Sequence, residues 1–371
     1  MGKQVRGINR REFLKQSAAA LTWLALPSLA RSGLEWPSQD PPASLGRIST
    51  WVPQAIRSEP LPDARLVAWK SYDEIIPLYA SLISKGPWPT NPIWYQTEGG
   101  FIHSGYVQPV ENTPAEEVVD PAEEGDFWAQ VCVPIAEARS RPESPYVLRK
   151  LYYGTVYRVV ALAEDAEGRK WYQLREGFAY SPSAYVPASS LQPIPPEALT
   201  PISDRPSDEL VRALAAARRR RFYRLVEVDE AADAIAARAP EKRIEINLAE
   251  QSLTCFEDGR AVFTTLISSG IAGLPTPRGE FRVIYKRHTQ RMVGPDFDLP
   301  GVSFPTYFTP SGVAIHGTYW HNDYGRPHSH GCVNVTNEAA RWIFRWSQPP
   351  VPYHLHTLVV PPGEGTRIIV Y

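Results

Sequence analysis

The residues best suited to chemistry lie between positions 316 and 334, where the sequence reads HGTYWHNDYGRPHSHGCVN. This stretch holds four of the 8 histidines and one of the 3 cysteines in the chain. The combination suits two kinds of chemistry: a zinc site with His and Cys ligands, or a thiol nucleophile with a histidine base.

A metal site would need three or four ligands to converge, and the available ones are His316, His321, His328, His330 and Cys332. Their spacing matches none of the compact zinc patterns, such as Cys-x-x-Cys with His-x-x-x-His, or His-Glu-x-x-His. We therefore predict no metal and no cofactor, and a zinc-binding protein remains an alternative.

A thiol nucleophile fits the order of these residues. A cysteine attacks as its thiolate, and a nearby histidine or an electropositive turn pulls the thiol pKa toward working pH. Cys332 follows Gly331, a residue that allows close approach of the backbone and turns N–H groups toward a bound carbonyl. His316 is the expected base, and the carbonyl of Gly317 is available to fix its tautomer. His321 is the main rival to His316 as base.

The remaining residues of the stretch have other interpretations. We expect His321, if it is not the base, and His328 to be polar loop residues or substrate contacts. Tyr319 and Trp320 are expected to form a pocket wall or to pack in the interior.

The elements that carry this stretch are predicted to be strands. After Pro240 the apolar residues recur with period two, which predicts strands at 244–248, 252–257 and 262–267. Cys255 lies on the second of these strands, so we expect it to be packed rather than reactive. A further β segment at 312–315 runs directly into His316.

Two segments of the first half resemble each other. Residues 94–101 read WYQTEGGF and are followed by Tyr106-Val107, and residues 171–178 read WYQLREGF and are followed by Tyr185-Val186. Each predicts an aromatic strand, a Gly turn and a second strand.

The order of aromatic and turn residues resembles bacterial SH3-like domains over residues 126–194 and, less closely, over residues 48–112. The resemblance implies two small β-barrels. Such modules bind a cell-wall polymer in some proteins and only pack against neighbouring domains in others, and both readings stay open.

A proline-rich linker with helices is predicted for residues 195–239. Ser207-Asp208-Glu209 is expected to cap a helix that ends in the basic run Arg218–Arg221.

The first thirty residues have the layout of an export signal. Basic residues precede the apolar stretch 17–30, which ends in the small-x-small pattern Ser28-Leu29-Ala30. Residues 9–15, NRREFLK, resemble the twin-arginine signal. The apolar stretch is shorter than the roughly 20 residues of a membrane-spanning helix. We therefore expect export by the twin-arginine route, with the membrane contacted only through residues 1–30, and a location in the cell wall or periplasm.

Composition excludes some classes of function. The 39 Lys and Arg residues balance 40 Asp and Glu residues, so no net charge favours a nucleic-acid partner. The chain of 371 residues is long enough for several domains, and its 37 Pro, 11 Trp and 18 Tyr residues favour short strands and many turns. We predict a mainly β protein.

The chemical motifs together resemble one family. Ile315-His316-Gly317 is followed, twelve residues further on, by His330-Gly331-Cys332-Val333-Asn334, and this pattern resembles the signature of L,D-transpeptidases of the YkuD fold. Residues 275–281, PTPRGEF, resemble an upstream element of the same family. The resemblance spans residues 240–371, and Asn334 stands where many members have arginine and others asparagine.

The resemblance implies a β-sandwich-like catalytic domain that transfers acyl groups through a cysteine. Cys332 would attack a peptidoglycan tetrapeptide stem, and His316 would move the proton. A thioester would then react with a second stem to give a 3-3 cross-link. The N–H groups of Gly331 and Cys332 would hold the oxyanion. Ser329, His330 and Asn334 would shape the pocket.

Two other functions remain open. Water in place of the second amine would make the same residues a hydrolase or L,D-carboxypeptidase. A catalytically inactive wall-binding scaffold is the alternative from another class. A papain-like peptidase is disfavoured, because its cysteine precedes its histidine whereas His316 precedes Cys332 here.

Overall fold

The computed structural model describes residues 44–175, 184–202, 241–294 and 297–371. The predicted export signal at 1–30 and the predicted helix with its basic run at 218–221 lie outside these residues. Within the described ranges no helix has the length and apolar character needed to cross a membrane.

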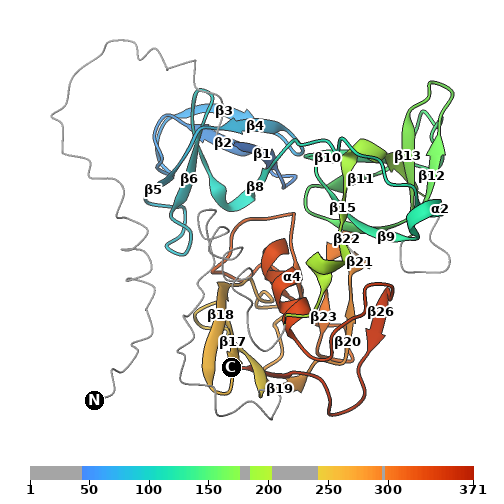
Figure 1. The fold of residues 1–371 in the computed structure, drawn as a ribbon. Coiled ribbons are helices and arrows are strands. Elements are labelled where there is room, and N and C mark those ends of the chain that lie inside the picture. Colours follow the sequence, from blue (N-terminus) through green and yellow to red (C-terminus); the bar gives the residue numbers. More distant parts are fainter. Residues whose placement is uncertain (1–43, 176–183, 203–240, 295–296) are drawn as a thin grey trace, which may run out of the picture. The chain divides into compact units, whose positions relative to one another are not determined.

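The N-terminal β-region, residues 44–110, is drawn in blue and cyan in Figure 1 and forms two sheets of order β4-β1-β8 and β3-β2-β7-β6-β5. Its elements are β1 (Ser44–Ile48), β2 (Gln54–Arg57), β3 (Leu66–Lys70), β4 (Ile75–Leu78), β5 (Ala80–Ile83), β6 (Ile93–Thr97), β7 (Gly100–His103), the 3-10 turn η1 (Ser104–Tyr106) and β8 (Val107–Val110). Ile48, Ile102 and Val107 are buried in its core.

The central β-region, residues 121–199, forms one sheet of order β11-β10-β14-β13-β12-β9-β15. Its elements are α2 (Pro121–Glu124), β9 (Phe127–Val131), β10 (Ile135–Arg139), β11 (Val147–Tyr152), β12 (Val156–Glu164), β13 (Lys170–Arg175), β14 (Ala184–Pro187), η2 (Ala188–Ser190), β15 (Leu191–Ile194) and η3 (Pro196–Leu199). Neither this sheet nor those of the N-terminal β-region closes into a barrel among the described strands, so the SH3-like barrels stay a prediction.

The structure contains the repeat. The residues that follow the Gly turn, however, correspond between the two copies in a different way from the one that the sequence suggests. In both copies a hairpin strand is followed by a 3-10 turn and one more strand: β7, η1 and β8 in the first, and β14, η2 and β15 in the second. Tyr106-Val107 therefore corresponds in element order to Ser190-Leu191, not to Tyr185-Val186. The sequence suggests the wrong correspondence because both copies contain a Tyr-Val pair, although these pairs lie on different strands of the repeat.

The C-terminal region, residues 241–371, contains a five-stranded sheet of order β18-β17-β16-β27-β19. Its strands are β16 (Lys242–Asn247), β17 (Ser252–Glu257), β18 (Arg260–Leu266), β19 (Gly279–Arg282) and β27 (Arg367–Val370). The three hairpin strands predicted after Pro240 are confirmed. Cys255 is 0% exposed on β17, as expected for a packed residue.

A second five-stranded sheet of order β25-β24-β23-β20-β26 carries the chemical motifs. Its strands are β20 (Tyr285–Arg287), β23 (Thr306–Tyr307), β24 (Ala314–Gly317), β25 (Val333–Val335) and β26 (Thr357–Val359), and beside it lies the hairpin β21 (Thr289–Val293) and β22 (Asp298–Ser303). Helix α4 (Asn337–Trp346) starts directly after β25, where the side chain of Thr336 caps it by accepting a hydrogen bond from the Ala339 N–H. The buried residues of α4, which include Ile343 and Phe344, join the core of this region.

Candidate active site

The pairing of β24 with β25 brings the two motif residues together. The strands are parallel, with His316 opposite Asn334 and Ile315 opposite Val333. Continuing this register by one residue places Cys332 beside Ala314. Side chains alternate between faces along a strand, so Cys332 and His316 share one face of the sheet, with Cα atoms roughly 8 Å apart on the diagonal.

His316 is a neutral imidazole that is protonated on one ring nitrogen only. Its ring is buried, and Nδ1 lies 2.9 Å from the carbonyl oxygen of Gly317. A carbonyl only accepts, so Nδ1 carries the proton and Nε2 keeps its lone pair. Burial lowers the pKa of His316 to about 4, although the bond to Gly317 opposes the shift. The predicted contact between His316 and the Gly317 carbonyl is therefore present.

Cys332 is half-buried, and its Sγ lies 3.8 Å from the carbonyl oxygen of Gly312. Burial raises the pKa of the thiol, and a backbone hydrogen bond from Ala314 partly opposes this. The thiol is therefore protonated at neutral pH, so a base must take its proton before it can attack.

The turn before Cys332 is fixed by hydrogen bonds. Gly331 has φ +118°, a conformation that side-chain-bearing residues rarely adopt. Its N–H donates to Ser329 Oγ at 3.0 Å, and Ser329 Oγ in turn donates to the Cys332 carbonyl. Thr276 Oγ1 donates to the Gly331 carbonyl at 2.8 Å. The Gly331 N–H predicted for the oxyanion is thus occupied by Ser329 in this structure.

His321, the rival base, uses both ring nitrogens elsewhere. Its Nδ1 accepts a hydrogen bond from the Asp323 N–H at 3.3 Å, and its Nε2 lies 3.0 Å from the side-chain amide of Asn334. His321 and Asn334 are both buried. Both ring nitrogens of His321 thus have partners within the loop and β25, whereas the hydrogen bond of His316 is made at Nδ1.

The other predicted residues separate into two groups. His328 is half-buried and bonds to Asp323, whereas His330 is exposed and its ring stacks on Phe297 with centroids 5.2 Å apart. The Trp320 ring lies 5.8 Å from that of His316, which makes it a wall of the site. Tyr319 is 3% exposed and therefore an interior residue.

A tyrosine pair next to Cys332 was not predicted from the sequence. Tyr285 pairs with Tyr307, and Tyr307 pairs with Ala314, so the two rings continue the row that ends at Cys332. Their rings stack with centroids 4.0 Å apart. Burial raises the pKa of Tyr307, and proximity to Tyr285 and Cys332 adds to the shift. Strand register is the only signal that links these residues to Cys332, and the sequence does not show it.

Thr276 was also missed as a contact to the site. It lies in the quoted segment PTPRGEF, and its hydroxyl joins the Gly331 carbonyl to the Gly270 N–H. The Thr-Pro pair was the available signal.

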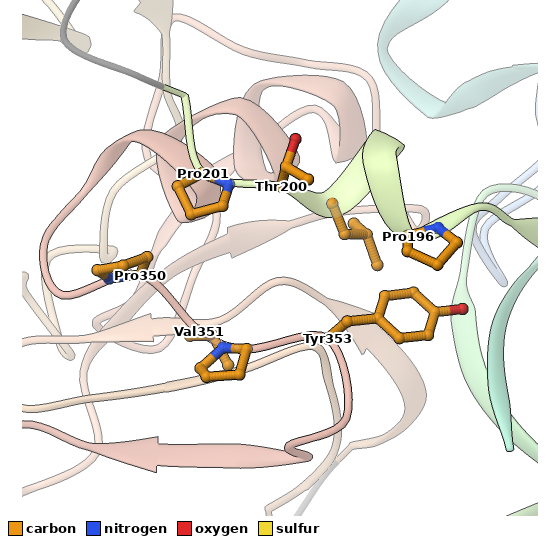
Figure 2. A pocket seen from close by; sticks show the side chains of 8 residues that line it. Pro196, Thr200, Pro201, Pro350, Val351 and Tyr353 are labelled. Carbon is orange, nitrogen blue, oxygen red and sulfur yellow. The ribbon is translucent and has the colours of Figure 1, made fainter. Parts of the chain in front are cut away.

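Among the described residues, no three His, Cys, Asp or Glu side chains converge in a way that could hold a metal ion. Figure 2 shows a pocket between η3 and the segment after α4, and its lining contains none of the predicted site residues; it is formed by Pro196, Leu199, Thr200, Pro201, Pro350, Val351, Pro352 and Tyr353.

Residues 241–370 match the YkuD family, described as the L,D-transpeptidase catalytic domain. The resemblance of the C-terminal region to this class of domain is thereby confirmed, and the class is that of L,D-transpeptidase catalytic domains.

Individual proteins are also similar to parts of this chain. The L,D-transpeptidase 1 of Mycobacterium tuberculosis is 29% identical over 109 residues, which cover 26% of this chain and 43% of that protein. The chain therefore spans less than half the length of this curated relative. Among solved structures, an L,D-transpeptidase from Xylanimonas cellulosilytica is 29% identical, with 44% of this chain and 69% of that chain covered and a TM-score of 0.27. The catalytic domain of the Enterococcus faecium L,D-transpeptidase is 25% identical, with 36% and 100% covered and a TM-score of 0.29.

Proposed function

We propose that this protein is a peptidoglycan L,D-transpeptidase that forms 3-3 cross-links through a thioester on Cys332. The observation that supports the proposal is the register of β24 and β25, because its extension by one residue puts Cys332 on the same face as a neutral His316, within the part of the chain that matches the family.

The first half-reaction is an acyl transfer to sulfur. His316 Nε2 takes the thiol proton as Cys332 Sγ bonds to the carbonyl carbon that precedes the terminal D-residue of a tetrapeptide stem. The C–N bond then breaks, and the D-amino acid leaves with the proton from His316. The Gly331 N–H serves the oxyanion once it releases Ser329 Oγ.

The second half-reaction returns the enzyme. The side-chain amine of another stem attacks the thioester, a new amide bond forms, and the C–S bond breaks. The proton lost by the amine returns to the thiol through His316. The thioester conserves the energy of the cleaved amide, so the exchange needs no ATP.

The proposal also covers the cellular location of the protein and its binding partners. A twin-arginine signal at residues 1–30 would bring the protein to the cell wall or periplasm, where peptidoglycan stems are the substrate. The two SH3-like regions would bind a cell-wall polymer.

The test is mass spectrometry of the products from a disaccharide-tetrapeptide, alone and with a second stem as acceptor. We expect loss of the terminal D-residue and, with acceptor, dimers. Cys332→Ala should abolish both, whereas Cys132→Ala, which removes another half-buried thiol, should not. Tripeptide without dimers would make the protein a carboxypeptidase, and no turnover would favour the scaffold.

A carbapenem gives an independent readout of the nucleophile. Its strained amide should acylate Cys332, giving an adduct in the intact mass that Cys332→Ala loses while it stays folded. An adduct on Cys132 or Cys255 would contradict the assignment.

A further inference from the structure

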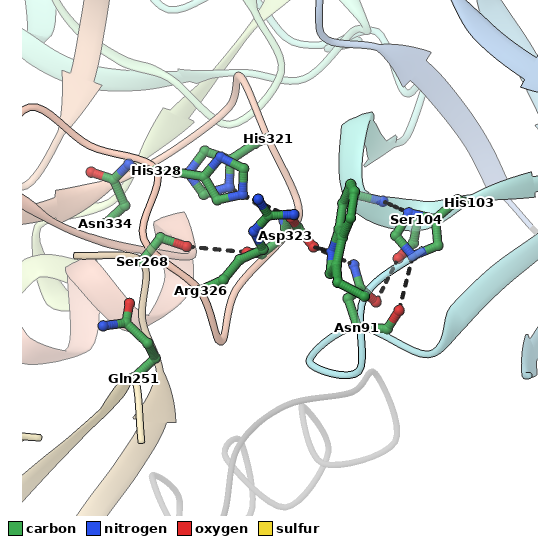
Figure 3. Close-up of polar contacts among 12 residues, drawn as sticks. Asn91, His103, Ser104, Gln251, Ser268, His321, Asp323, Arg326, His328 and Asn334 are labelled. Carbon is green, nitrogen blue, oxygen red and sulfur yellow. Dashed lines mark hydrogen bonds and ion pairs between the residues drawn. The ribbon is translucent and has the colours of Figure 1, made fainter. Parts of the chain in front are cut away.

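A buried carboxylate lies in the loop between the two catalytic residues and is held by the N-terminal β-region. Asp323 is 0% exposed. It accepts hydrogen bonds from Trp88 Nε1 at 2.9 Å, from Asn91 Nδ2 at 2.8 Å and from His328 Nε2 at 2.7 Å (Figure 3). Trp88 and Asn91 come from the connection between β5 and β6, so one carboxylate joins segments more than two hundred residues apart in the sequence.

The donors on the N-terminal side are themselves fixed. The Asn91 side-chain oxygen accepts from Ser104 Oγ at 3.1 Å, and the Asn91 carbonyl lies 2.9 Å from His103 Nε2. These contacts turn the Asn91 NH2 group toward Asp323, as Figure 3 shows. The guanidinium of Arg326 lies 4.0 Å above the Trp88 ring and 3.5 Å from Asp323. The Asn91 donor is therefore held by contacts within its own region, and the Trp88 ring is covered by a residue of the loop.

The charge of Asp323 is retained in this buried place. Burial would raise the pKa of Asp323, but the hydrogen bonds from His328, Trp88 and Asn91 outweigh it and hold the pKa below its usual value. A buried carboxylate with several donors is costly to disturb, because loss of one donor leaves charge without compensation.

Two short routes lead from Asp323 to the reacting residues. Along the chain, His328 precedes Ser329, which bonds both Gly331 and Cys332. Across the interior, the His328 ring stacks on that of His321 with centroids 4.6 Å apart, and His321 contacts Asn334, the register partner of His316.

The same loop is also held at its start. Arg47 Nη2 donates to the Tyr319 carbonyl at 2.6 Å, and the Asn322 N–H donates to the Gly105 carbonyl at 2.8 Å. Each of these contacts also comes from the N-terminal β-region, which therefore touches the loop at several points.

We propose that the N-terminal β-region is part of the catalytic apparatus, with Trp88 and Asn91 as positioning residues that act on Cys332 through Asp323. The inference rests on the proposed function in taking Cys332 as the nucleophile. It gives the N-terminal β-region the role of positioning the nucleophile, in addition to any binding of a cell-wall polymer.

The test uses the full chain with Trp88→Phe, which keeps an aromatic ring and removes the N–H donor, and Asp323→Asn, which keeps the shape and removes the charge. The matched control is Trp69→Phe, because Trp69 lies in the same region and is 57% exposed. Two rates are measured at a temperature where circular dichroism shows each variant folded. The first is the turnover of the stem substrate. The second is the alkylation of Cys332 by iodoacetamide, which is measured by peptide mass spectrometry over a range of pH.

We expect Trp88→Phe and Asp323→Asn to lower kcat by about 10–100-fold with little change in KM, since displaced reacting groups cost rate rather than substrate binding. The pH profile of Cys332 alkylation should shift in the same variants and not in Trp69→Phe. Unchanged kcat and alkylation in folded Trp88→Phe would overturn the inference.

The two proposals can fail separately. If the wild-type chain does not turn over stems, the alkylation profile still decides whether Trp88 and Asp323 act on Cys332. If wild type and Trp88→Phe form dimers at equal rates and their Cys332 alkylation profiles agree, the transpeptidase proposal stands and the positioning proposal falls.

Discussion

His316 and Cys332 rest as a neutral pair. Burial lowers the pKa of the imidazole to about 4 and raises that of the thiol, so the proton stays on sulfur at pH 7. In the proposed mechanism His316 acts as a general base when a substrate carbonyl is in place, rather than as the partner of a preformed thiolate.

This resting state predicts the pH dependence of alkylation. A raised thiol pKa means that the thiolate fraction grows as pH rises, so iodoacetamide should modify Cys332 slowly at pH 6 and progressively faster through pH 9. The rate is measured by peptide mass spectrometry, with half-buried Cys132 as internal comparison. A rate that is already maximal near pH 6 would instead indicate a thiolate–imidazolium pair.

At the scale of single residues, sequence order and residue chemistry are the grounds on which Cys332 and His316 are proposed as the reacting pair. They did not decide against His321, because only its contacts with Asp323 and Asn334 show that both ring nitrogens are used. Asp323 itself carried no signal, since its donors Trp88 and Asn91 lie far away in the sequence.

Among the elements, β24 is confined by the start of α4. A Cβ at Gly317 would lie 2.1 Å from Asn337 Oδ1 and 3.1 Å from Asn337 Cα, so a side chain there would clash with the Asn337 side chain and press on the start of the helix. The position of the Gly317 carbonyl, which fixes the His316 tautomer, therefore depends on this glycine.

Gly317→Ala should accordingly cost about 1–3 kcal/mol of unfolding free energy and reduce kcat, because an overpacked contact shifts the strand. The free energy is measured by urea unfolding and kcat with the stem assay. Asn337→Ala alone is the control, and the double variant should recover part of both losses. Equal defects in the single and double variants would show that the clash with Asn337 is not the cause.

At the scale of elements, the sequence predicted where the strands lie better than it predicted which strands pair with each other. The period-two pattern located β16, β17 and β18. The row from Tyr285 through Tyr307 to Cys332 depends on pairing between distant strands, which local periodicity does not encode.

Across the whole molecule, buried histidines couple folding to pH. Burial lowers the pKa of His288 to about 3 and that of His356 to about 4, in addition to the lowered values of His316 and His321. An unfolded histidine titrates near 6.5. Below that pH the unfolded chain binds more protons than the folded chain, so stability is full above about pH 6.5 and falls toward pH 4.

We expect Tm to drop by about 5–10 °C between pH 7 and pH 5. His288→Phe should flatten this dependence, since a phenyl ring keeps the stacking on Trp128 and removes the titrating group. Differential scanning calorimetry measures both, with His354→Gln, a change at an exposed residue, as the control. A Tm that is constant over this range would contradict the role of the buried histidines.

The parallel pairing of β24 and β25 also limits how this protein can be redesigned. Parallel neighbours cannot be joined by a tight turn and need a crossover of about a dozen residues or more. The interval 318–332 is thus a geometric requirement of bringing His316 and Cys332 to one face. A protein engineer who wished to shorten it would reach the minimum crossover length after removing only a few residues. Insertions meet no such limit, so the crossover can be lengthened without a change in the register of β24 and β25.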